Sequence, residues 1–237
     1  GSHEHAWRLE PLLLGYIWVG DAFPEEDRVE IQSALRRASD WLIDNPCDQH
    51  NNRGAVWCAI VAMCGILFDR LDALEKAEAL GRDIMPAVVL EDGEIGEHTK
   101  QYAGGGPCTN YTYTGLGYVY LFLLLSNADW LHERLHLGMR WLSRFNSVDG
   151  HPLATGASVR SGTPSSPIQD ALPSLERYSK TDHTFGWISE RYTDHIESRG
   201  TRFGGHITCP LIWASLEAGE SGSSERPPWV LDQLTMH

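Results

Sequence analysis

Two polar segments of the chain combine side chains that can neutralise a carboxylate and move protons. The first is Asn51-Asn52-Arg53, just ahead of an apolar helical segment. The second runs from Asp92 past His98 to Tyr111 and Tyr113, between two apolar helical segments, where a connecting loop would present it at the mouth of a cleft. An amide or a guanidinium stabilises charge on a carboxylate, and a histidine or a tyrosine can take or give a proton. These residue types predict acid–base chemistry on a substrate that carries a carboxylate.

β-Elimination of a uronic acid polymer needs this equipment. The proton beside a carboxylate is too weakly acidic for His or Tyr unless aimed donors stabilise the enolate, which contributes a few kcal/mol per donor. Asn52 and Arg53 can do this without a metal or cofactor, so none is expected. A phenol ionises near about pH 10, so a tyrosine base needs a neighbouring cation, for which Arg53, His98 or Lys100 are available.

Apolar residues at three- and four-residue spacing predict the helices that must position these groups. We expect helices over about 25–45, 54–70, 71–89, 113–126 and 129–145, with nearly all-apolar helices alternating with amphipathic ones. Alternation of this kind is typical of helical hairpins packed around a common centre. The prediction is a mainly α protein, an incomplete or small (α/α) toroid with an irregular C-terminal third, although a plain helical bundle would give nearly the same pattern.

The 237 residues predict one compact unit. Residues 1–3 look like a purification-tag remnant, and 4–146 form the helical-hairpin core. Gly, Pro, Ser and Thr dominate 147–180, which predicts a long loop or lid. Residues 181–219 are interpreted as the C-terminal part of the same domain and 220–237 as a poorly ordered tail.

Three motifs together resemble the α/α-toroid polysaccharide lyases, which include the alginate, hyaluronate, chondroitin and heparin lyases. They are the Asn51-Asn52 pair, the Asp-Gly-x-x-x-x-His-Thr loop over 92–99, and the Tyr-x-Gly at 113–115. The resemblance covers about residues 40–145. It implies β-elimination of an acidic polysaccharide or oligosaccharide, and a secreted or periplasmic location.

The resemblance also implies roles for individual residues. Asn52, with Asn51 behind it, would neutralise the carboxylate, His98 would match the family histidine, and Tyr111 or Tyr113 would be the catalytic tyrosine. Alginate lyases of this kind commonly read Asn-Asn-His, whereas here an arginine follows the pair and a Gly-Gly-Gly-Pro insertion precedes the tyrosines. Substrate-binding roles are expected for Asn51, Arg53, Lys100, Tyr102 and Arg202, and Tyr102 could also substitute for the catalytic tyrosine.

Composition restricts the partners. A net charge of −13 argues against a nucleic-acid surface, which needs a clustered basic patch, and an anionic substrate would have to be met by a few local cations. No apolar run reaches the roughly 18 residues of a membrane span. The histidines His183, His195 and His206 lack zinc-ligand spacing, so no metal site is expected.

Two other functions stay open from the residues alone. A glycoside hydrolase on the same scaffold would use paired carboxylates such as Asp92, Glu94, Glu97 or Asp182. A non-catalytic carbohydrate-binding or scaffold domain would use the aromatic side chains for stacking. The asparagine pair is also a common helix cap, and the tyrosines could serve packing.

Overall fold

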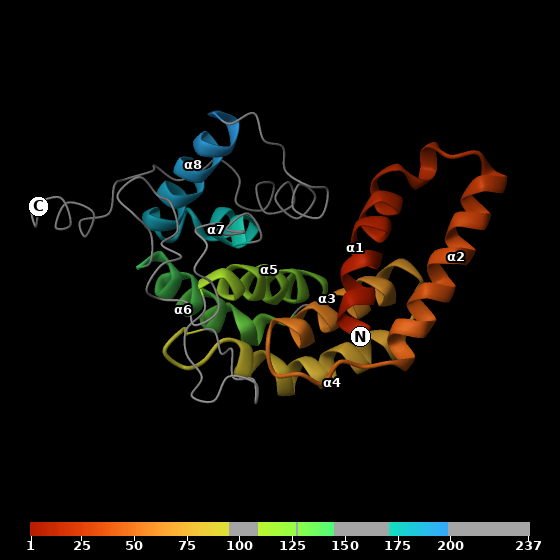
Figure 1. The fold of residues 1–237 in the computed structure, drawn as a ribbon, viewed down its shortest axis with the longest axis horizontal. Helices are drawn as coiled ribbons and strands as arrows, with labels where there is room; N and C mark the ends of the chain where they lie inside the picture. Colours follow the sequence, from red (N-terminus) through yellow and green to blue (C-terminus); the bar gives the residue numbers. More distant parts are fainter. Residues whose placement is uncertain (95–108, 127, 145–170, 199–237) are drawn as a thin grey trace, which may run out of the picture.

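The computed structural model describes residues 1–94, 109–126, 128–144 and 171–198, and this part of the chain is mainly α-helical, as predicted (Figure 1). The elements, in chain order, are α1 (Ser2–Val19), η1 (Gly20–Ala22), α2 (Glu25–Asp44), α3 (Asn52–Leu67), α4 (Leu71–Val88), α5 (Thr109–Ser126), η2 (Asp129–Leu131), α6 (His132–Ser143), α7 (Leu172–Tyr178) and α8 (His183–Ser198). No helix among the described residues is long and apolar enough to cross a membrane.

The helices pack in two rows of successive hairpins. Each odd-numbered helix packs on the even-numbered helix that follows it, and α1, α3, α5 and α7 also contact one another in turn. We call these four helices the inner row and α2, α4, α6 and α8 the outer row. The α1–α2 and α7–α8 hairpins lie at opposite ends of the described part, with α3 to α6 between them (Figure 1).

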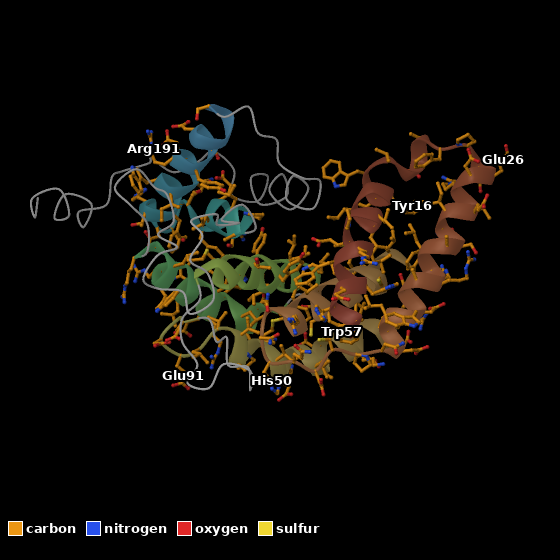
Figure 2. The ribbon with its side chains drawn as sticks, in the orientation of Figure 1. Tyr16, Glu26, His50, Trp57, Glu91 and Arg191 are labelled. Carbon is orange, nitrogen blue, oxygen red and sulfur yellow. The ribbon has the colours of Figure 1, made fainter. Side chains whose placement is uncertain are left out.

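The burial pattern explains why the rows differ. Helix α3 is apolar on every side and is packed by α1, α2, α4 and α5, so most of its residues are buried. Helix α4 instead buries one stripe at three- and four-residue spacing, as expected for a helix with a solvated face: Ala73, Ala77, Gly81, Ile84 and Val88. Trp57 of α3 is fully buried and its Nε1 donates to the Leu42 carbonyl at 3.0 Å, and Figure 2 shows it among the helices of the N-terminal half.

Contacts between helices establish their directions. A Cβ on Gly54, at the start of α3, would meet Ile84 near the end of α4, and one on Gly65, near the end of α3, would meet Leu74 near the start of α4. Helices α3 and α4 are therefore antiparallel. Trp57 lies in the first half of α3 and bonds to Leu42 near the end of α2, so α2 and α3 are antiparallel as well.

Helix α4 is also antiparallel to α5. Glu78, in the first half of α4, accepts from Trp130 Nε1, just beyond the end of α5. Val89 follows α4 and lies against Gly138, which also contacts Leu116 in the first half of α5. The inner helices α3 and α5 therefore run parallel, and their N-terminal ends lie on the same side of the inner row.

The C-terminal third contains more regular structure than the sequence predicted. Within the expected 147–180 loop, α7 occupies Leu172–Tyr178, and α8 extends over His183–Ser198, where irregular structure was expected. Burial explains both helices. Their buried apolar residues lie three or four positions apart, as on one face of a helix: Leu172 and Leu175 of α7, and Phe185, Ile188 and Tyr192 of α8.

Other expectations for the ends of the core fall partly inside the described residues. Residues 2 and 3 of the expected tag remnant belong to the first turn of α1, a helix that the sequence analysis did not predict. The expected tail, 220–237, lies outside the described residues.

Candidate functional site

The Asn51-Asn52-Arg53 segment begins α3 on the side of the inner row where α5 also begins. Asn51 is the N-cap, with extended backbone, and its Oδ1 accepts from Arg53 N at 3.0 Å. Gly54 allows this start to pack tightly, because a Cβ there would lie 2.1 Å from the Gln49 carbonyl oxygen. Capping therefore accounts for Asn51, whose amide satisfies an N–H that the first helical turn leaves unpaired.

Asn52 is not explained by capping. Its side chain is 2 % exposed, and its Nδ2 is buried without a hydrogen-bond partner among the described residues. A buried donor with no acceptor costs about 1–3 kcal/mol, so native proteins rarely retain one without a reason. An acceptor from a bound ligand, such as a carboxylate oxygen, would satisfy this amide.

Arg53 adds a positive charge beside the asparagine pair. Its Nη1 donates to Gln49 Oε1 at 3.3 Å, a contact to a neutral amide that leaves the charge uncompensated by that partner. Burial lowers the pKa of His3, and the positive charge of Arg53 lowers it further, which places this imidazole near the start of α3. Arg53 therefore places one positive charge at the start of α3, with the carboxylates of Glu4 and Asp48 also in its neighbourhood.

The loop that carries the second motif starts next to α6. Asp92-Gly93 forms a turn in which Gly93 has φ +89° and a Cβ would lie 2.3 Å from the Leu137 carbonyl oxygen, so only glycine fits. Asp92 Oδ1 accepts from Glu94 N at 3.0 Å and stabilises the turn. The turn is thereby held against α6.

The two candidate tyrosines lie in the first turns of α5. The helix begins at Thr109, four residues before the predicted start, so both Tyr111 and Tyr113 are helical, but their side chains lie outside the described residues. Helix α5 begins on the same side of the inner row as Asn52. The remaining predicted site residues also lie outside the described part of the chain: His98, Lys100, Tyr102 and Arg202.

Carboxylates proposed for hydrolysis have structural partners. Asp182 accepts from Arg140 Nε at 3.1 Å and from Thr184 N at 3.0 Å, which places it at the start of α8. Asp92 holds the turn described above. Glu94 lies in the same turn, and Glu97 lies outside the described residues.

A buried carboxyl on α1 escaped the sequence analysis. Glu10 is 3 % exposed and accepts a hydrogen bond from Tyr118 Oη at 2.5 Å, so this tyrosine of α5 serves to bind α1. The available signal was a single acidic residue within the apolar segment Leu9 to Leu14.

A second cluster was also missed. His132 and His136 begin α6 and both pack against Tyr178 of α7. The signal was present in the sequence, because residues 132–136 read His-Glu-Arg-Leu-His, whereas the expectation about metal binding concerned the more C-terminal His183, His195 and His206.

No protein-family model matches the chain, and neither curated proteins nor solved structures give a significant match. The class that the fold defines is therefore a mainly α-helical protein of packed hairpins, with a candidate site at the N-terminal ends of its inner helices.

Proposed function

We propose that this protein is a polysaccharide lyase that cleaves a uronate-containing polymer by β-elimination on an (α/α)-toroid scaffold. The single observation that carries the proposal is the buried, unpartnered Nδ2 of Asn52 on the side of the inner row where α3 and α5 begin. The hairpins, packed in two rows, are the repeating unit from which such a toroid is built.

The proposed reaction combines Asn52 with the proton-transfer residues predicted from the sequence. Asn52 donates to the uronate carboxylate and stabilises the enolate that develops when the C5 proton leaves. The electron pair of the C5–H bond forms the C4–C5 double bond, and the C4–O bond breaks with its pair on the glycosidic oxygen. A base, His98 or one of Tyr111 and Tyr113, takes the C5 proton, and an acid from the same set returns a proton to the leaving oxygen.

The hydrolase alternative receives less support. Asp182 and Asp92 are already engaged, one with Arg140 and the start of α8 and the other in the Gly93 turn. A general acid and a nucleophile or base need carboxyls that face one substrate bond. The described carboxylates of this set instead stabilise two separate structural elements.

The test incubates the protein with a panel of uronate polysaccharides and follows the ultraviolet absorbance of the conjugated unsaturated uronate. Asn52→Ala, His98→Ala and Tyr113→Phe are expected to lose the activity, and each removed donor or proton-transfer group should lower kcat/KM by about 10²–10³. The matched control is Asn45→Ala, which removes an exposed asparagine amide at the end of α2. The proposal fails if no polymer gives an unsaturated product. New reducing ends without unsaturated product would indicate hydrolysis, and binding without turnover would indicate a carbohydrate-binding domain.

A further inference from the structure

The two histidines at the start of α6 lie on one face of the helix. His132 and His136 are four residues apart, which places their side chains one turn apart with Cβ atoms about 5–6 Å from each other. Their ring centroids lie 5.9 and 6.1 Å from that of Tyr178, so both imidazoles face the same phenol of α7. His132 Nδ1 is hydrogen-bonded to Tyr178 Oη.

His136 has an unmet requirement at this face. Its Nε2 is buried and has no hydrogen-bond partner among the described residues, and its ring packs edge-on against Phe185 at a centroid distance of 5.4 Å. Phe185 offers neither a donor nor an acceptor. A buried ring nitrogen in this state can be satisfied by water or by a metal ion.

The sequence over 132–136 has the spacing that directs two imidazoles to one ion. His-Glu-x-x-His on a helix places both histidines on the same side, where they can ligate one zinc ion. In metallopeptidases the intervening glutamate also acts as a base, but here Glu133 is exposed. The arrangement therefore suits a structural ion that links helices.

Charged groups of both signs surround this face. Asp129 Oδ1 lies 3.6 Å from His132 Nε2, within ion-pair distance of the second ring nitrogen. Arg140 pairs with Asp182 at 3.1 Å, which offsets part of its positive charge. The guanidinium of Arg177 lies 5.9 Å from the Tyr178 ring centroid and would be balanced by a phenolate ligand.

We propose that His132, His136 and Tyr178 bind one divalent transition-metal ion of the zinc class, which fastens α6 to α7. Two imidazole nitrogens and the phenol oxygen supply three ligands, and water completes a four-coordinate site. Within the described ranges, no three His, Cys, Asp or Glu side chains could hold a metal ion together, so the proposed site depends on the phenol as its third protein ligand. On binding, the ion replaces the proton of the His132 Nδ1–Tyr178 Oη hydrogen bond, this proton passes to solvent, and the two ligand atoms move apart to admit the ion; no electron is transferred.

The test uses the full chain, freed of metal with a chelator and then titrated with Zn²⁺ alone and with Co²⁺ alone. We expect one ion per chain by calorimetry, an increase in Tm, and the visible bands of four-coordinate Co²⁺. His132→Gln and His136→Gln should each weaken binding by at least about tenfold, since even loss of an orienting partner costs 10–100-fold in metal affinity. Tyr178→Phe should weaken it and alter the Co²⁺ spectrum.

The matched control is His50→Gln. His50 is also an imidazole beside a carboxylate, with Nε2 2.8 Å from Asp83 Oδ2, but it is exposed at the edge of the molecule and its partner belongs to α4 rather than to α6 or α7 (Figure 2). The control should bind Zn²⁺ as wild type does. Wild-type affinity in the folded His132→Gln or His136→Gln protein, or no metal-dependent change in Tm or Co²⁺ spectrum, would overturn the proposal, whatever the result on uronate polymers.

Discussion

The two adjacent asparagines at the start of α3 differ in the hydrogen bonding of their side chains. Asn51 Oδ1 accepts from Arg53 N, so Asn51→Ala should destabilise the protein by about 0.5–2 kcal/mol, as for other N-caps. Asn52 Nδ2 has no partner among the described residues, so Asn52→Ala should cost less through hydrogen bonding. Urea unfolding of both variants measures the difference. A larger loss for Asn52→Ala than for Asn51→Ala would show that the Asn52 amide is satisfied in the unliganded protein.

The cysteines of α3 should be inert in the native protein. Cys58 and Cys64 are free and buried, and burial raises the pKa of Cys64 from its ordinary value of 9.0 to about 11. Cys47 is buried too, and burial also raises its pKa. Because the reactive species is the thiolate, none of the three should be alkylated at about pH 8 before unfolding. Peptide mass spectrometry after labelling with and without denaturant identifies the thiols that react.

The raised pKa of the Cys64 thiol predicts a loss of stability at alkaline pH. The folded-state pKa of Cys64 is raised above its unfolded value, so the folded protein holds this proton more tightly. The contribution of this proton to the free energy of unfolding is complete below pH 9.0 and is lost as the pH rises toward about 11. Tm should therefore fall more steeply with pH over this window in wild type than in Cys64→Ala. Parallel Tm curves for the two proteins would contradict the assignment.

At the scale of elements, glycines inside helices test the packing between the rows. Gly81 of α4 faces α5, and a Cβ there would lie 2.5 Å from the Phe122 ring, whereas nothing lies within 4 Å of a Cβ on Gly15 of α1. Alanine ordinarily stabilises a helix interior by about 1 kcal/mol relative to glycine. Gly15→Ala should therefore stabilise the protein, and Gly81→Ala should destabilise it by about 1–3 kcal/mol because of overpacking. Chemical unfolding of both variants checks the two signs.

Helices were predictable where their burial was periodic or complete. The apolar run of α3 and the stripe of α4 indicated both helices to within a few residues. Helix α8 was missed because His183, Thr184 and Gly186 in its first turn are typical of loops, and its burial arises from contact with α6 and α7. The local sequence pattern does not indicate contacts between separate helices.

The candidate sites divide in the same way. The Asn51-Asn52 pair was visible in the sequence, but only the structure separates the cap from the unpartnered amide. The meeting of His132 with Tyr178 joins residues 46 apart in the sequence, so spacing within α6 indicates two ligands and the fold supplies the third.

For the whole molecule, the proposed substrate and the protein carry charge of the same sign. The net charge of −13 would repel a uronate polymer at long range, while in the proposed reaction Asn52 and Arg53 would act on it only at contact distance. The Debye length falls from about 30 Å at 0.01 M to about 8 Å at 0.15 M ionic strength, so added salt screens the distant repulsion before it weakens the direct contacts. Raising the salt over this range should therefore lower KM with little change in kcat.

A measurement on Arg53→Gln separates the effect of one local cation from the effect of the net charge. Arg53→Gln removes a local cation and adds one unit to the repulsion, so its KM should exceed that of wild type and should still fall as salt is added. Initial rates of unsaturated-product formation at several ionic strengths, with uronate polymers of equal length, provide both curves. A KM that rises steadily with salt from the lowest ionic strength would mean that a cluster of cations, rather than the overall negative field, governs the approach of the polymer.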